Sequence, residues 1–230
     1  MDSMDEWLST YVKMLKGTID RNQKFLETRG KILRDALKKY LETWATIDDI
    51  VSKTDRSGNT VMYFTVCNIW FPSGVFSLIY NVLSSDIGGA LRTLRFALEA
   101  IEIGLIGDCH PSLEFQRKTL EEKVAELSEM RPRDIREALK PLVDHETMES
   151  LIDLYNRSSQ LMHPTSFGQK LIELFRETKD IPSMALYYPN LSEFESEIIR
   201  DFVELIEQFC KIAKKLISIW KDCIFRRDFA

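Results

Sequence analysis

Glycine, proline and histidine are all scarce in this sequence. Nine glycines and seven prolines in 230 residues are too few turn formers for an all-β fold, and they exclude a collagen-like or disordered chain. An excess of positive charge is also lacking, because 31 basic and 36 acidic side chains give a net charge of −5. We therefore expect no binding to a long DNA duplex, which requires a broad positive field.

Cysteine is scarce too, and its spacing predicts neither a zinc site nor a disulfide framework. The four cysteines, at Cys67, Cys109, Cys210 and Cys223, contain no Cys-x-x-Cys pair. The N-terminus lacks the basic and then apolar pattern of a secretory signal. The sequence also contains no glycine-rich phosphate loop and no kinase or hydrolase motif. We therefore expect a reduced, cytoplasmic protein with no disulfide, no metal and no cofactor.

The sequence does contain strong helical periodicity at both ends. Apolar residues recur mainly three, four or seven positions apart in these regions. This spacing predicts a long amphipathic helix over 4–45, with a kink at Gly30, and a second one over 191–226. Two helices of this length are expected to pack against each other in one bundle.

The segment between 57 and 85 carries no formal charge. It predicts two short helices, over 60–70 and 72–84, that are apolar on all faces and form the buried centre of the bundle. A membrane-spanning segment over 61–83 is the alternative. The polar residues within the segment and its interruption at Pro72 argue against that alternative, so no membrane association is expected.

The remaining segments predict shorter helices, over 87–106, 112–130, 133–141, 145–162 and 168–177, with an irregular stretch over 180–190. Asp86 and Asp144 are the predicted N-caps of two of them, and Gly104 and Gly107 are predicted to end the first. Because the chain has no internal repeat, we predict one all-α domain over 1–230. Its parts are a long N-terminal helix and turn (1–55), central helices (56–190) and a long C-terminal helix (191–230).

Among the three histidines, His163 is the strongest candidate for chemistry. His110 lies in a predicted loop, and His145 lies at a helix start between two carboxylates. His163 follows Arg157 by six residues and precedes Pro164, which moves it out of the helix at the last turn. An imidazole transfers protons near neutral pH, and a guanidinium binds phosphate through its planar fork. Arg157 and His163 are therefore the predicted catalytic pair.

The segment from Arg157 to His163 resembles the Arg-x4-6-His motif of the HEPN superfamily. An earlier pair, Arg95 and Glu99, resembles the Arg-x3-Glu feature of related helical families. The resemblance implies a homodimer that binds or cleaves RNA without a metal, with Arg157 and His163 of both subunits in one cleft. RNA supplies its own nucleophile, the 2′-hydroxyl, so the protein has to move protons and stabilise charge on phosphorus.

The resemblance also implies a setting and supporting residues. The setting is defence or a toxin–antitoxin system, in which an antitoxin or another protein is a partner. Asn156 and Ser159 are expected to orient the histidine or the phosphate by hydrogen bonding. Arg95 and Glu99 are expected to line the same cleft.

These residues also have structural interpretations. Arg157 can pair with Asp153, four residues earlier, while His163 satisfies the last carbonyls of the helix. Arg95 and Glu99 can form an ordinary ion pair one helical turn apart. The alternative function is then a non-catalytic helical module that binds itself or a protein partner through its long N- and C-terminal helices.

Overall fold

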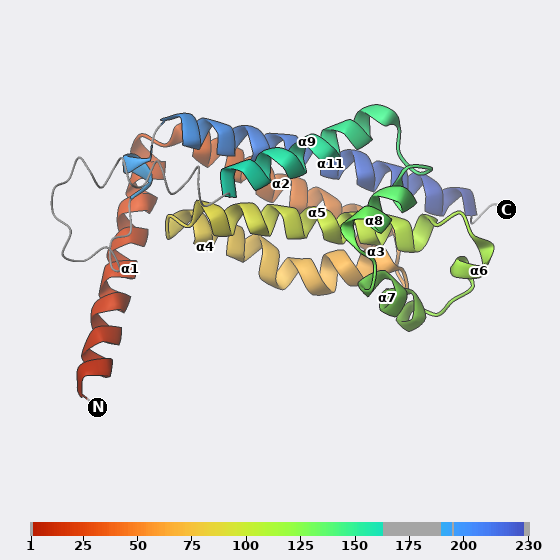
Figure 1. The fold of residues 1–230 in the computed structure, drawn as a ribbon, viewed down its shortest axis with the longest axis horizontal. Coiled ribbons are helices and arrows are strands. Elements are labelled where there is room, and N and C mark those ends of the chain that lie inside the picture. Colours follow the sequence, from red (N-terminus) through yellow and green to blue (C-terminus); the bar gives the residue numbers. More distant parts are fainter. Residues whose placement is uncertain (1, 163–189, 195, 228–230) are drawn as a thin grey trace.

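Every element in the described part of the chain is a helix (Figure 1). The computed structural model describes residues 2–162, 190–194 and 196–227, so the predictions for 168–177 and 180–189 lie outside the described residues. The elements are α1 (Asp2–Thr28), α2 (Lys31–Thr54), α3 (Val61–Tyr63), the π-helix η1 (Phe64–Val75), α4 (Phe76–Leu83), α5 (Ile87–Cys109), α6 (Leu113–Gln116), α7 (Leu120–Ser128), α8 (Pro132–Leu139), α9 (His145–Met162), the 3₁₀-helix η3 (Leu191–Glu193) and α11 (Ser196–Arg227). The predicted all-α bundle is confirmed.

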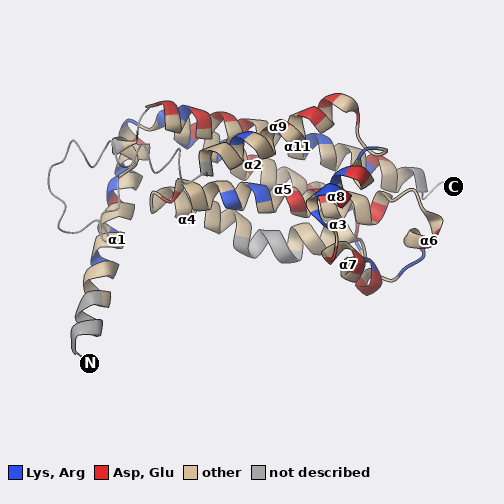
Figure 2. Ribbon diagram, in the orientation of Figure 1, with Lys and Arg blue, Asp and Glu red and all other residues tan. Residues whose placement is uncertain are grey.

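The central helix of the bundle is α5. It packs against α11, α3, η1 and α4, and 16 of its 23 residues are buried. We expected residues 60–84 to be buried on all faces. One face is buried, since Val61, Leu78 and Val82 are 0% exposed, but the prediction is wrong for the other face, where Phe76 and Tyr80 are 68% and 48% exposed. The distribution of charge does not follow burial. In Figure 2, the partly exposed helix α4 carries no charged residue, whereas the middle of the buried helix α5 carries charges of both signs.

Residues 61–83 form one continuous helical run instead of two short helices. The π-helix η1 passes through Pro72, where we expected an interruption. A wider π-turn is a known way to accommodate a residue that cannot complete the regular hydrogen-bond ladder. Within the described residues, none of the helices combines the length and the apolar character that a membrane crossing requires.

Two glycines of α5 allow the helical run to approach it closely. A Cβ on Gly104 would lie 2.8 Å from Met62 Cα, and a Cβ on Gly107 would lie 2.7 Å from Val61 Cβ. We predicted that these glycines end the helix, but α5 continues to Cys109. Their role is close helix packing, which a side chain at either position prevents.

A buried carboxylate joins three helices at the C-terminal end of α5. Asp108 accepts hydrogen bonds from the backbone N–H groups of Val61 (2.8 Å) and Met62 (2.9 Å) and from Trp220 Nε1 (2.8 Å). Burial raises the pKa of Asp108, and the three hydrogen bonds oppose that rise. The carboxylate therefore caps α3 and fixes α11 against α5.

The next residue, Cys109, forms a disulfide with Cys223 of α11, with their Cα atoms 6.1 Å apart. The expectation of a chain without a disulfide is therefore wrong. The two cysteines are 114 residues apart in sequence, and only the packing of α11 along α5 brings them together. The other two, Cys67 and Cys210, are free thiols.

The N-terminal region forms two helices where we predicted one long helix with a kink. The chain breaks at Gly30, where a Cβ would lie 2.8 Å from the Phe25 ring. The second helix, α2, packs along α11, whereas the N-terminal end of α1 projects from the body of the bundle (Figure 1). Leu8 and Val12 on α1 are 53% and 54% exposed.

The base of α1 is held by one buried side chain, Asn22. Its Nδ2 donates hydrogen bonds to the Leu83 carbonyl (2.8 Å) and to Ser85 Oγ (2.7 Å). Its Oδ1 accepts a hydrogen bond from the backbone N–H of Leu191 (2.8 Å). Three segments distant in sequence therefore meet at Asn22.

Candidate functional site

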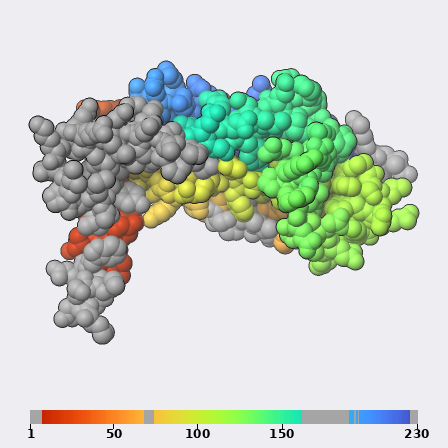
Figure 3. Space-filling model, viewed as in Figure 1, coloured from red at the N-terminus to blue at the C-terminus, as the bar shows by residue number. Residues whose placement is uncertain are grey.

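Several titratable side chains of α5 and α9 line one hollow in the described part of the chain, the α5–α9 crevice. It lies where α8 and α9 pack beside α5, an arrangement visible in Figure 3, and it encloses about 300 Å³. Its lining combines polar and apolar side chains. The polar ones are Arg95, Glu99, Glu102, Ser128, Arg136 and Tyr155, and the apolar ones are Ile103, Leu127, Met130, Pro132 and Ile135.

Helical spacing places the polar residues on facing stripes. Arg95, Glu99 and Glu102 occupy positions i, i+4 and i+7 of α5, which share one face of a helix. Tyr155 and Ser159 are four residues apart on α9 and face that stripe. The sequence predicted α9 with the same bounds, because Asp144 supplies its N-cap.

Arg95 crosses from α5 to α9. Its Nη1 donates a hydrogen bond to Ser159 Oγ (3.2 Å), and its guanidinium carbon lies 5.3 Å from the centre of the Tyr155 ring. That distance is typical of a cation–π contact. Among the described residues, Arg95 pairs with this hydroxyl and this ring and forms no ion pair with Glu99. Three predicted supporting residues, Arg95, Glu99 and Ser159, therefore do come together.

Glu102 lies at the base of the crevice and is only 3% exposed. Its Oε2 accepts a hydrogen bond from the Tyr155 hydroxyl (3.0 Å), and no described group donates to its Oε1. Burial, reinforced by the nearby charge of Glu99, raises the pKa of Glu102 to about 8. Burial also raises the pKa values of Glu99 and Tyr155. Of these groups, Glu102 therefore keeps its proton at neutral pH.

Arg157 lies on a different side of α9. It is two residues away from both Tyr155 and Ser159, which is about 200° around the helix axis. Its Nη2 forms an ion pair with Glu204 (2.8 Å), and its Nη1 donates to Gln208 (3.4 Å), both on α11. These residues line a second groove of about 720 Å³ between α2, α9 and α11.

Arg157 forms its ion pair with Glu204 and not with Asp153, the partner that we predicted. Asp153 accepts a hydrogen bond from Gln208 (2.9 Å), while Arg157 pairs with Glu204. Asn156 is exposed. His163 lies outside the described residues, so the convergence of Arg157 and His163 stays a prediction.

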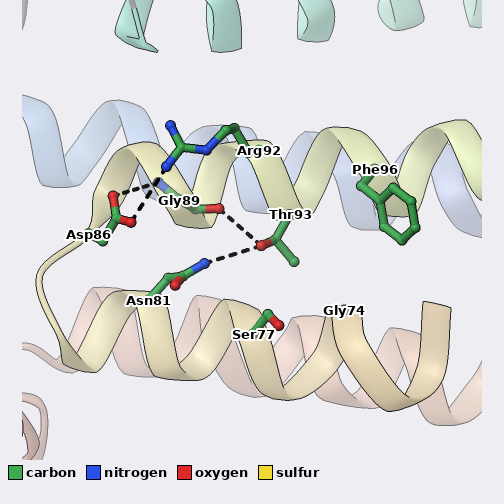
Figure 4. A pocket seen from close by; sticks show the side chains of 8 residues that line it. All are labelled: Gly74, Ser77, Asn81, Asp86, Gly89, Arg92, Thr93 and Phe96. Atoms are coloured by element: carbon green, nitrogen blue, oxygen red, sulfur yellow. Dashed lines mark hydrogen bonds and ion pairs between the residues drawn. The ribbon is translucent and has the colours of Figure 1, made fainter. Parts of the chain in front are cut away.

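A third hollow, of about 400 Å³, lies between α4 and the start of α5 (Figure 4). Asp86 accepts a hydrogen bond from the Gly89 N–H (2.7 Å), which confirms the predicted N-cap, and it pairs with Arg92 at 3.5 Å. Asn81 donates to Thr93 (3.2 Å). Because these polar groups satisfy one another, this hollow is a weaker candidate than the crevice.

The described residues contain no group of three His, Cys, Asp or Glu side chains that could hold a metal ion. Comparison of the chain with family models, with curated proteins and with solved structures finds no match. Function therefore has to be inferred from the site itself.

Sequence reasoning missed Glu102 and the role of Tyr155. One signal was available, because Glu102 stands between Ile101 and Ile103 in an otherwise apolar stretch of α5. A carboxylate at such a position is either paired or functional. Its partner, Tyr155, is 53 residues away in sequence, so spacing alone does not reveal the pair.

Proposed function

We propose that the protein is a HEPN-like protein that acts on RNA as a homodimer and cleaves it without a metal, with the α5–α9 crevice binding phosphate. The supporting observation is the state of Arg95. Its guanidinium contacts a hydroxyl and an aromatic ring, and among the described residues it forms no ion pair, although the charge of Glu99 lies nearby. A cytoplasmic location and a protein partner such as an antitoxin belong to the same proposal.

Arg95 suits phosphate binding better than Arg157 does. A guanidinium binds phosphate most strongly when two of its N–H groups point at two oxygens. The two terminal nitrogens of Arg157 already donate to Glu204 and Gln208. The ion pair with Glu204 has to break before Arg157 can bind a second anion. Arg95 gives up only a hydrogen bond to Ser159.

The proposed chemistry assigns proton transfer to His163. His163 follows Ser159 by four positions in the sequence and comes directly after α9, which ends at Met162. In this mechanism the imidazole takes the proton of the RNA 2′-hydroxyl, and the oxygen then attacks the adjacent phosphorus. The bond between phosphorus and the 5′-oxygen breaks, the 5′-oxygen takes a proton from water, and a 2′,3′-cyclic phosphate forms on the other fragment. Arg95 stabilises the charge that grows on the phosphoryl oxygens.

The test is cleavage of a fluorescent single-stranded RNA by purified protein in EDTA, with binding followed by anisotropy. We expect Arg95→Ala to lose binding and cleavage, and His163→Ala to keep binding while it loses cleavage. Arg92→Ala is the matched control, because Arg92 lies three residues earlier on α5 and pairs with Asp86 in a different hollow. If Arg95→Ala and Arg92→Ala act alike, the proposal is wrong.

Arg157→Ala separates the two candidate arginines in the same assay. Its ion pair with Glu204 is half exposed, so its loss is expected to lower the free energy of unfolding by less than about 1 kcal/mol. A variant that is folded but inactive would transfer the phosphate-binding role from Arg95 to Arg157. Retained cleavage supports the assignment to Arg95.

The second candidate function is a non-catalytic interaction module, and the projecting end of α1 favours it. Leu8 and Val12 are four residues apart and both more than half exposed, an arrangement suited to helix pairing. Light scattering of the full chain and of a Leu8→Asp, Val12→Asp variant tests this function. A dimer that becomes a monomer in the variant, together with no RNA cleavage by either protein, favours the module.

A further inference from the structure

Among the described residues, Arg95 does not form the ion pair that its own helix offers. Glu99 is four residues later on α5, the spacing at which an arginine and a glutamate commonly pair. The guanidinium of Arg95 crosses to α9 instead, where it contacts the Tyr155 ring and Ser159. The contacts with α9 therefore determine where this side chain lies.

The two contacts on α9 differ in what they take from the guanidinium. The hydrogen bond to Ser159 Oγ (3.2 Å) uses an N–H group that an anion also needs. The Tyr155 ring, whose centre is 5.3 Å from the guanidinium carbon of Arg95, attracts the cation and uses no N–H group. When an anion takes the place of Ser159, the contact with the ring does not have to break.

The hydroxyl of Tyr155 fixes the position of the ring. It donates a hydrogen bond to Glu102 Oε2 (3.0 Å), and Glu102 is buried within α5. Arg95 and Glu102 are seven residues apart, which places them on one face of α5 and about 10 Å apart along its axis. Tyr155 reaches from α9 to both of them, so its ring is held at one end by its own helix and at the other by Glu102.

We propose that Tyr155 is a positioning residue, whose ring directs the guanidinium of Arg95 away from Glu99 and keeps its N–H groups available for an anion. The inference deepens the proposed function and rests on it, because that function identifies the anion as an RNA phosphate. In this arrangement Tyr155 acts through Arg95, and Glu102 acts through Tyr155.

The first test is NMR spectroscopy of the full chain labelled with ¹⁵N-arginine. Protons over the face of an aromatic ring resonate upfield, so we expect one shifted side-chain N–H signal that is missing in Arg95→Ala. Glu102→Gln is expected to keep this signal, because its amide oxygen still accepts the hydrogen bond from the Tyr155 hydroxyl. In Tyr155→Phe the ring stays but loses its anchor, so the shift is expected to become smaller. In Tyr155→Leu the shift is expected to disappear.

The second test is binding of fluorescent single-stranded RNA, followed by anisotropy. Loss of a cation–π contact at a partly exposed arginine changes an affinity by about two- to fivefold, so we expect Tyr155→Leu to weaken RNA binding by this factor. Glu102→Gln is expected to bind as the native protein does. Phe96→Leu is the matched control, since Phe96 follows Arg95 on α5 but lines the hollow between α4 and α5. It is expected to change neither the Arg95 signal nor the RNA affinity.

A Tyr155→Leu protein with a native circular-dichroism spectrum that keeps the Arg95 signal or the native RNA affinity would overturn the role of Tyr155. Equal effects of Tyr155→Leu and Phe96→Leu would overturn it too. If Tyr155→Leu does not fold, the smaller change expected in Tyr155→Phe decides in the same way. A native protein that binds no RNA contradicts the proposed function, and the NMR series then decides whether Tyr155 orients Arg95.

Discussion

The side chain of Glu102 couples the candidate site to pH. A carboxyl group buried beside Tyr155 and near Glu99 keeps its proton to a pKa of about 8, whereas the same group in the unfolded chain releases it near pH 4.3. A group whose pKa is raised on folding contributes stability that is present below the unfolded pKa and lost as pH rises through the folded pKa. Between about pH 4 and 8, Glu102 therefore makes the protein less stable as pH increases.

Glu102→Gln is expected to remove this dependence. The variant should show a smaller fall in the free energy of unfolding between about pH 4 and 8, and it should exceed the native protein in stability at pH 8. Urea denaturation at a series of pH values measures this. The exposed-site variant Glu129→Gln should follow the native curve, and a Glu102→Gln curve parallel to the native one would contradict a pKa of Glu102 raised by burial.

Single residues were predictable from the sequence where their role is local. Asp86 and Asp144 cap the helices they were expected to cap, because a cap contacts only the next turn of its own chain. The partners of Arg157 and Glu102 lie 47 and 53 residues away, on other helices. Their roles depend on which helices pack together, and spacing within one segment does not contain that information.

The helix α5 closely approaches α3 at Gly104 and Gly107, and these two glycines are sensitive positions. In Gly107→Ala the new methyl group would lie 2.7 Å from Val61 Cβ, so α3 or α5 has to shift. We expect a loss of about 1–3 kcal/mol in the free energy of unfolding, the usual cost of overpacking a core. Thermal or urea denaturation gives the value.

Gly88→Ala, at the opposite end of the same helix, is the control. A Cβ at Gly88 meets only Asp86 and Arg92 side-chain atoms, at 3.5 and 3.6 Å, which is ordinary contact. Alanine there is expected to stabilise the protein by up to about 1 kcal/mol, because it reduces the freedom of the unfolded chain. Equal destabilisation by both substitutions would contradict the assignment to close packing at Gly107, because helix propensity alone favours alanine over glycine.

The helix bounds were predictable where amphipathic periodicity meets a clear cap, as in α9. The sequence failed at the N-terminal region because periodicity continues on both sides of Gly30, and the break depends on where the Phe25 ring lies. It failed in part over 60–84, where the lack of charge suggested burial on every face and only one face is buried. Apolar residues are common on protein surfaces, so the absence of charge alone does not locate the core.

At the scale of the whole molecule, the Cys109–Cys223 disulfide closes a loop of more than a hundred residues. Cys223→Ser is therefore expected to lower the free energy of unfolding by about 2–4 kcal/mol, because the open chain has more unfolded conformations. A thiol reductant should lower the stability of the native protein to the same level and leave the variant unchanged. Cys67→Ser, which removes a free thiol, should keep the response of the native protein to reductant; a native protein that ignores reductant would contradict the disulfide.

Asp108, the residue before Cys109, links α5 and α11 in a way that does not depend on the redox environment. Asp108 accepts a hydrogen bond from Trp220, and a reductant does not break this contact. It lies beside the disulfide that joins the same two helices. We therefore expect a reducing environment to weaken the attachment of α11 to α5 without changing the alignment of the two helices. The crevice on α5 is then expected to keep its geometry in either redox state.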